Sequence, residues 1–114
     1  MSVKLTTRQV GEVTVVDAAG RITLGEGASI FRDTLRDLAG NGKKKLLLNL
    51  GEVSYIDSSG IGEMVSGFTT VTNAGGQVKL LNLTKRVKDL LQITKLYTVF
   101  EVFEDEAAAV RSFT

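Results

Sequence analysis

The segment SYIDSSGIGEM, residues 54–64, brings one acid, two adjacent hydroxyls and two glycines together between apolar residues. Asp57, Ser58 and Ser59 are the side chains in it that could do chemistry. This combination is compatible with a catalytic serine, a loop that cradles a phosphate, a phosphorylation site, or the capped start of a helix. The surrounding sequence favours some of these possibilities over others.

A catalytic serine has little support. The nucleophile elbow of serine hydrolases reads Gly-x-Ser-x-Gly, but Ile56 stands two residues before Ser58, and Asp57 two before Ser59. The chain contains no histidine, which removes the usual base of a Ser-His-Asp triad and most zinc sites. It also contains no cysteine, so a disulfide framework is excluded. We therefore predict that the protein is not an enzyme and holds no metal.

Nucleotide binding and aspartyl phosphorylation are also weakly supported. Gly60 and Gly62 precede a predicted helix, but Val65 occupies the third position of a Gly-x-Gly-x-x-Gly fingerprint. No Gly-Lys-Ser/Thr phosphate loop occurs anywhere in the chain. A receiver domain phosphorylated at Asp57 would need an acidic pair after the first strand to hold magnesium, and Asp17 has no such neighbour. We predict no cofactor.

Length and composition indicate one globular domain over residues 1–114. Hydrophobic residues make up 43% of the chain, which is enough to form a core. The net charge of +1 gives no strong field for nucleic acid or anionic lipid, so neither is a predicted partner. A membrane span needs about 20 apolar residues, and no such run occurs. The N-terminus lacks the apolar block of a signal peptide, and we predict a cytoplasmic protein.

The elements that must position the Asp57 segment follow from hydrophobic periodicity and from glycine punctuation. Two strands around Gly11 should form an antiparallel hairpin because their connection is so short. The later elements are a helix over 26–39, a strand over 45–50 with a link over 51–56, a helix over 59–74, a strand over 77–83, a helix capped by Thr84, a strand over 97–103, and a helix from about residue 104. This order predicts an α/β fold, with a mixed, mostly parallel sheet and an N-terminal antiparallel hairpin, covered by about four helices.

The outer face of the predicted helix over 59–74 carries almost no charge. At about 100° per residue, one stripe of it is small or neutral. This uncharged stripe consists of Ser58, Gly62, Ser66, Thr69 and Asn73. A surface without charges loses little desolvation free energy when another protein docks on it. A low-charge helix face without any partner is the alternative interpretation.

Ser58 would lie at the edge of such a docking surface. Phosphorylation would add a charge of about −1.5 to −2 there. The helix N-terminus could tolerate the phosphate, whereas a docked partner would bury it next to the Asp57 carboxylate. A single phosphate could therefore abolish binding without unfolding the domain. Ser58 or Ser59 could instead serve as the cap of the helix.

The run Asp57-Ser58-Ser59-Gly60 with Gly62, followed by Gly75-Gly76 and LLNLTKRVKDLLQITKL, resembles the STAS domain of bacterial anti-sigma-factor antagonists. The likeness extends from the first hairpin to the last helix. It implies a non-enzymatic domain that binds an anti-sigma factor with serine kinase activity. It also implies that this kinase phosphorylates Ser58, that binding is then lost, and that a serine phosphatase restores it. The residues predicted to contact the partner are Asp57, Ser58, Ser59, Gly60, Gly62, Ser66 and Thr69.

The sequence departs from the family pattern in one loop. After the second strand, family members often read Gly-Glu-Leu-Asp or Gly-Asp-Leu-Asp, whereas this chain reads Gly20-Arg21-Ile22-Thr23. Arg21 and Thr23 thus replace two carboxylates on a loop that we expect beside the Ser58 junction. A different partner would fit this change. The alternative function is a non-phosphorylated STAS subunit of a larger signalling or lipid-transport complex.

Overall fold

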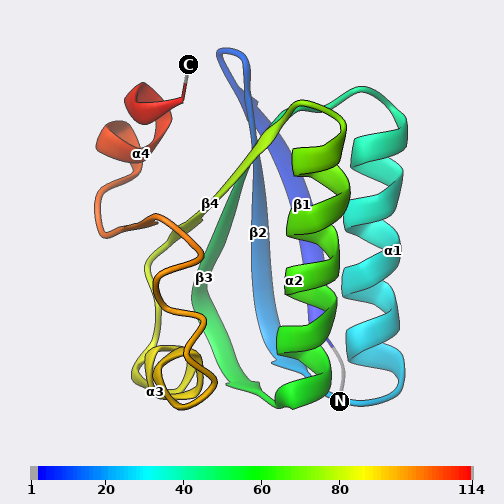
Figure 1. Ribbon diagram of the computed structural model, residues 1–114, viewed down its shortest axis with the longest axis vertical. Helices are drawn as coiled ribbons and strands as arrows, with labels where there is room; N and C mark the ends of the chain where they lie inside the picture. The colour runs from blue at the N-terminus through cyan, green and yellow to red at the C-terminus, as the bar shows by residue number, and fades with distance from the viewer. Residues whose placement is uncertain (1–2, 114) are drawn as a thin grey trace.

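A computed structural model describes residues 3–113 as a five-stranded sheet with helices on both of its faces (Figure 1). The elements, in chain order, are β1 (Val3–Val10), β2 (Val13–Ile22), α1 (Glu26–Gly40), β3 (Lys45–Ile56), α2 (Ser58–Asn73), β4 (Gln77–Leu81), α3 (Lys85–Ile93), β5 (Val102–Phe103) and α4 (Glu106–Ser112). The strands lie in the order β1-β2-β3-β4-β5. β1 pairs with β2 antiparallel, and all other pairs are parallel. The predicted fold class is confirmed.

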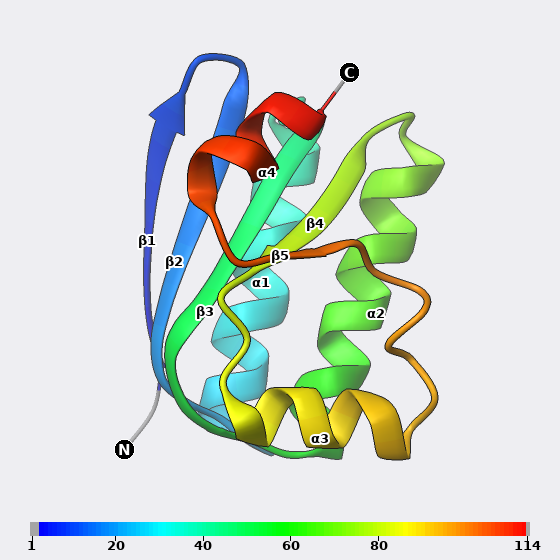
Figure 2. The ribbon, with the colours of Figure 1, turned by 90° about the vertical axis from the view of Figure 1, so that its left-hand side faces the viewer.

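The helices divide the two faces of the sheet unequally. α1 and α2 lie side by side along one face, and α4 covers only part of the other (Figures 1 and 2). α3 lies across the end of the sheet to which the parallel strands run (Figure 2). That end also carries the start of α2, so the connections after β2, β3 and β4 meet there. Ligand and partner sites in open α/β sheets tend to form at this end.

Two apolar cores hold these layers together. Phe31, Leu48 and Met64 belong to the larger core between the sheet and the α1–α2 layer. Leu47 and Phe113 belong to the smaller core under α4. Fully burying one such side chain contributes about 1.5–3 kcal/mol. Because β3 contributes to both cores, the first half of its sequence is a nearly continuous apolar run, of which Leu46, Leu47, Leu48 and Leu50 are buried.

The predicted link over residues 51–56 is wrong, because β3 continues to Ile56. β3 stays paired with β2 by inserting an extra residue twice, once opposite 17–19 and once opposite 20–21. These irregularities let Val53 and Ile56 remain buried although Gly51 interrupts the apolar pattern. The strand therefore carries Asp57 directly to the start of α2.

The predicted strand over 97–103 is largely wrong, because β5 contains only Val102 and Phe103. Lys95 adopts a left-handed φ of 61°, and the amide of Val99 donates to the carbonyl of Leu96 in a turn. The other predicted helix ends are confirmed within one or two residues. Thr84 caps α3 as predicted, with its hydroxyl oxygen accepting from the amide of Val87 at 3.4 Å.

Candidate functional site

Asp57 joins three elements at the start of α2. Its Oδ1 accepts a hydrogen bond from the amide of Gly60, and its Oδ2 accepts one from the amide of Leu24, both at 2.9 Å. Its own amide donates to the carbonyl of Ile22 at 3.3 Å. Asp57 therefore caps α2 and also holds the loop between β2 and α1 against it. Burial raises the pKa of Asp57, but hydrogen bonds from the amides of Leu24 and Gly60 outweigh this and hold the pKa below its usual range.

The prediction that Ser58 or Ser59 caps the helix is wrong, because Asp57 is the N-cap residue. The carboxylate of an N-cap residue accepts a hydrogen bond from the amide three residues later in the chain. In this helix, the amide of Gly60 donates that hydrogen bond to Asp57. Neither serine hydroxyl makes a hydrogen bond to any part of residues 3–113. Ser58 is exposed, whereas Ser59 is half-buried. The cap at Asp57 thus leaves the Ser58 hydroxyl accessible and unbonded.

Gly60 and Gly62 have different roles although both were predicted to contact a partner. Gly60 is buried, and a Cβ at this position would collide with the carbonyl oxygen of Ile22 and would lie 2.7 Å from the side chain of Ile56. It therefore lets α2 approach the ends of β2 and β3. Gly62 is exposed, and a Cβ there would meet nothing within 4 Å. Of these two glycines, Gly62 is therefore the one whose α-carbon an approaching molecule could contact.

The uncharged stripe is a solvent-exposed face of α2, as predicted. Ser58, Gly62, Ser66, Thr69 and Asn73 are all exposed. Asp57 and Ser59 flank the upstream end of the stripe. Whether a partner contacts these residues remains a prediction.

Leu24 also belongs to this surface, although it was not among the residues predicted from the sequence. Its side chain is 80% exposed, although leucine is usually buried. Its amide is held by Asp57, which fixes the loop beside Ser58. One signal was available in the sequence, because Leu24 precedes Gly25 and lies outside both the alternation of β2 and the helical spacing of α1. The proximity to Asp57 depends on a contact 33 positions apart, which local pattern does not encode.

Two arginines stack on Tyr55 at the same end of the sheet. The guanidinium carbons of Arg21 and Arg86 lie 4.7 Å and 4.2 Å from the centre of the Tyr55 ring. Arg21 pairs with Tyr55 across β2 and β3, and Arg86 belongs to the first turn of α3. The loop predicted to begin at Gly20 is wrong at its start, because β2 continues to Ile22 and Arg21 is a strand residue. The loop that follows does lie beside the Ser58 junction as expected, because the amide of Leu24 donates to Asp57.

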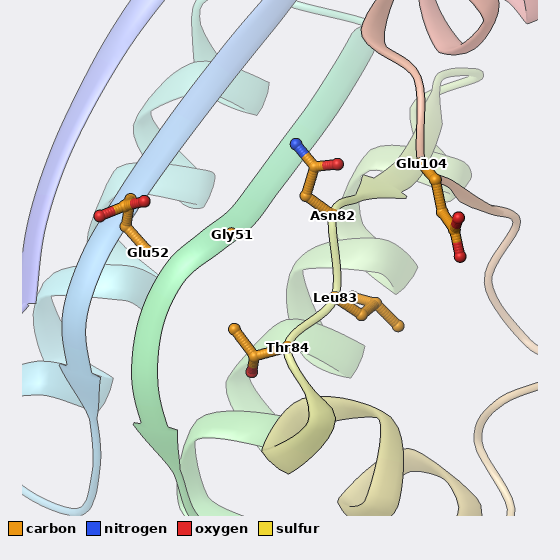
Figure 3. A pocket seen from close by; sticks show the side chains of 6 residues that line it. All are labelled: Gly51, Glu52, Asn82, Leu83, Thr84 and Glu104. Carbon is orange, nitrogen blue, oxygen red and sulfur yellow. The ribbon is translucent and has the colours of Figure 1, made fainter.

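A hollow of about 510 Å³ opens below α4, on the face of the sheet opposite to α1 and α2 (Figure 3). It is lined by Gly51, Glu52, Asn82, Leu83, Thr84 and Glu104. The Glu52 and Glu104 carboxylates lie at opposite rims and do not converge on a common point (Figure 3). No group of three acidic, histidine or cysteine residues within 3–113 could hold a metal ion. In the same range, no helix is both long and apolar enough to cross a bilayer.

The chain is similar to proteins that are already known. Residues 4–109 match the model of the STAS domain. The anti-sigma-B factor antagonist of Bacillus subtilis is 34% identical over 102 residues, which cover 90% of this chain and 92% of that protein.

Solved structures share the fold. An anti-sigma factor antagonist from Mycobacterium paratuberculosis superposes with a TM-score of 0.86 at 13% identity, covering 98% of this chain and 94% of the other. The phosphorylated form of the Bacillus cell fate determinant SpoIIAA superposes with a TM-score of 0.75 at 19% identity, covering 95% and 97%.

Proposed function

Because the chain belongs to the STAS domain family, we propose that it is an anti-sigma-factor antagonist whose binding is switched by phosphorylation at Ser58. In its unphosphorylated state it binds an anti-sigma factor through the start of α2, and so keeps that factor from its sigma factor. The antagonist names of its relatives support this function.

The accessibility of Ser58 is the observation that carries the proposal. Its hydroxyl is exposed and has no hydrogen-bond partner within residues 3–113, because Asp57 already caps the helix. A kinase can therefore reach this oxygen without opening the fold. Ser59 is half-buried and is a poorer acceptor.

A phosphate on Ser58 would act on binding and not on folding. The group would extend from the first turn of α2, where the helix dipole favours negative charge. In the free protein, water would screen it from the neighbouring Asp57 carboxylate. Under a docked partner that screening is lost, and an unpaired buried charge costs several kcal/mol. The switch therefore needs no conformational change.

Two further proteins complete the proposed cycle. The anti-sigma factor would itself be the serine kinase, and a serine phosphatase would restore Ser58. The antagonist supplies only the acceptor hydroxyl and the docking surface, and we assign it no catalytic residue. Its cytoplasmic location and its lack of enzyme activity remain predictions.

Protein with phosphoserine built in at position 58 during translation tests the proposal without a known kinase. Unmodified and modified protein are used side by side to retain binding proteins from the source cells, and a protein held only by the unmodified form is identified, purified and titrated. We expect phosphorylation to weaken its binding by about 100-fold, or about 3 kcal/mol, with an unchanged thermal melt. With that protein and ATP, Ser58 should be modified, and Ser58→Ala should abolish incorporation.

Equal binding by the two forms would overturn the switch and would favour a constitutive subunit. Phosphate mapped mainly to Ser59, Ser54 or Thr69 by mass spectrometry would overturn the choice of residue. A Ser58→Asp variant is a poorer probe, because it adds one charge where phosphate adds nearly two.

A further inference from the structure

Arg21, Tyr55 and Arg86 form a basic clamp that the residues of the proposed switch do not explain. The three come from β2, β3 and α3, so the fold itself brings them together. Both guanidinium groups lie within 5 Å of the centre of one ring, at 4.7 Å and 4.2 Å. One arginine on a tyrosine is a common stabilising contact. A second arginine on the same ring adds repulsion between two like charges.

Neither arginine of the clamp has a carboxylate partner within the described residues 3–113. Some other cations are paired, such as Arg8 with Asp17 at 2.7 Å and Lys79 with Glu101 at 3.0 Å. Arg21 and Arg86 are both exposed. The clamp is therefore a concentration of positive charge that is open to solvent.

The start of α3 makes this concentration stronger. A helix N-terminus carries a partial positive charge and favours acidic residues in its first turn. α3 has no acidic residue there, and instead begins with Lys85 and Arg86. Lys85 is paired with Asp89 at 2.8 Å, which leaves Arg86 without a counter-charge. Like-charge repulsion, the helix dipole and the missing partner would all be relieved by one anion at the clamp.

We propose that the clamp binds an acidic side chain of the protein that docks on Ser58, an inference that rests on the proposed function. Short segments connect the clamp to that surface: Arg21 lies three residues before Leu24, and Tyr55 three before Ser58. Leu24 is 80% exposed and is fixed to Asp57, so it offers an apolar contact beside the charge. A small free anion would neutralise the clamp but would leave Leu24 in water. A protein with a carboxylate next to an apolar side chain would both neutralise the clamp and cover Leu24.

The test measures binding of the purified partner, identified by its selectivity for unphosphorylated Ser58, to the double variant Arg21→Glu/Arg86→Glu. At about 0.1 M NaCl the double variant should bind at least about tenfold more weakly, mainly through slower association. Raising NaCl to about 1 M shortens the Debye length from about 10 Å to about 3 Å. Salt should therefore weaken binding by the wild type, but strengthen binding by the double variant, in which repulsion is screened. A purely structural role of the arginines would not reverse this dependence.

Arg111→Glu is the control, since it makes one such charge reversal, half the change of the double variant, on α4 at the other end of the sheet (Figure 1). It should bind like the wild type. If the double variant melts early, Arg21→Gln/Arg86→Gln replaces it and should remove the salt dependence without reversing it.

Two outcomes would overturn the inference and leave the proposed function intact. One is an affinity unchanged by the double variant while phosphorylation of Ser58 still abolishes binding. The other is inorganic phosphate that binds the clamp at submillimolar concentration without competing with the partner, which would make the clamp a small-anion site. If no protein distinguishes unphosphorylated from phosphorylated Ser58, the proposed function fails, and the inference fails with it.

Discussion

Gly62 is the residue at which the proposed docking surface can be tested most directly. It is exposed, its φ lies outside the left-handed region, and a Cβ would meet nothing within 4 Å. Gly62→Arg therefore places bulk and a charge on the uncharged stripe without strain. We expect partner affinity to fall at least about tenfold, or about 1.4 kcal/mol. Replacing a helical glycine can recover roughly 0.5–1 kcal/mol, so a thermal melt should not show destabilisation.

Asp37→Arg is the control for this variant. Asp37 is exposed on α1, and it has no ion pair within residues 3–113. Its replacement should leave binding unchanged. If Gly62→Arg folds normally and binds as well as the wild type, the uncharged stripe is not the interface, and its lack of charge has another cause.

α4 is an element whose attachment to the sheet should depend on pH. Arg8 on β1 donates to Asp17 at 2.7 Å and to Glu106 at 2.6 Å, and so ties the first turn of α4 to the sheet. Hydrogen bonds from Arg8 are the main cause that holds the pKa of Asp17 and of Glu106 below its usual range. Because both pKa values are depressed on folding, this stabilisation is present above about pH 4 and is lost as the pH falls through the folded values.

We expect amide protection in α4 to fall below about pH 4 more than protection in α2. Hydrogen exchange, corrected for its intrinsic pH dependence, measures this. Arg8→Gln should lower α4 protection at neutral pH and remove most of its dependence on acid. Lys79, which donates to the carbonyl of Ser112 at 2.9 Å, should keep the far end of α4 in place. Equal loss of protection in both helices would show that acid acts on the whole fold.

The elements show what local sequence can and cannot predict. Thr84 was recognisable as a cap, because capping joins residues that are three apart. The continuation of β3 beyond Gly51 was not, because it depends on two bulges set by pairing with β2. The cap at Asp57 also joins residues that are three apart, yet it was assigned to the serines. A carboxylate that also accepts from Leu24 is favoured there, and that contact is not local.

At the scale of the whole molecule, the candidate site lies where the chain crosses repeatedly from strand to helix. The ends of β2 and β3 and the starts of α2 and α3 meet at one end of the sheet (Figures 1 and 2). Exposed and charged residues from segments far apart in sequence therefore lie close together at this end, as Arg21, Tyr55 and Arg86 do. The sequence gives the type of each of these residues, but their proximity depends on the order of the strands in the sheet. The same end must also be tightly packed to hold the site in place.

Gly60 and Gly62 allow this packing to be measured with two substitutions of the same kind. Gly60→Ala forces a methyl group against the carbonyl oxygen of Ile22, where β2 meets α2, and overpacking of this sort costs about 1–3 kcal/mol. Gly62→Ala adds the same methyl group in open space on the same helix, and should stabilise by roughly 0.5–1 kcal/mol. Chemical denaturation of a domain this small should be cooperative, so the two midpoints should move in opposite directions. If Gly60→Ala instead matched Gly62→Ala, then α2 would not need this close approach, and Asp57 alone would set the position of Ser58.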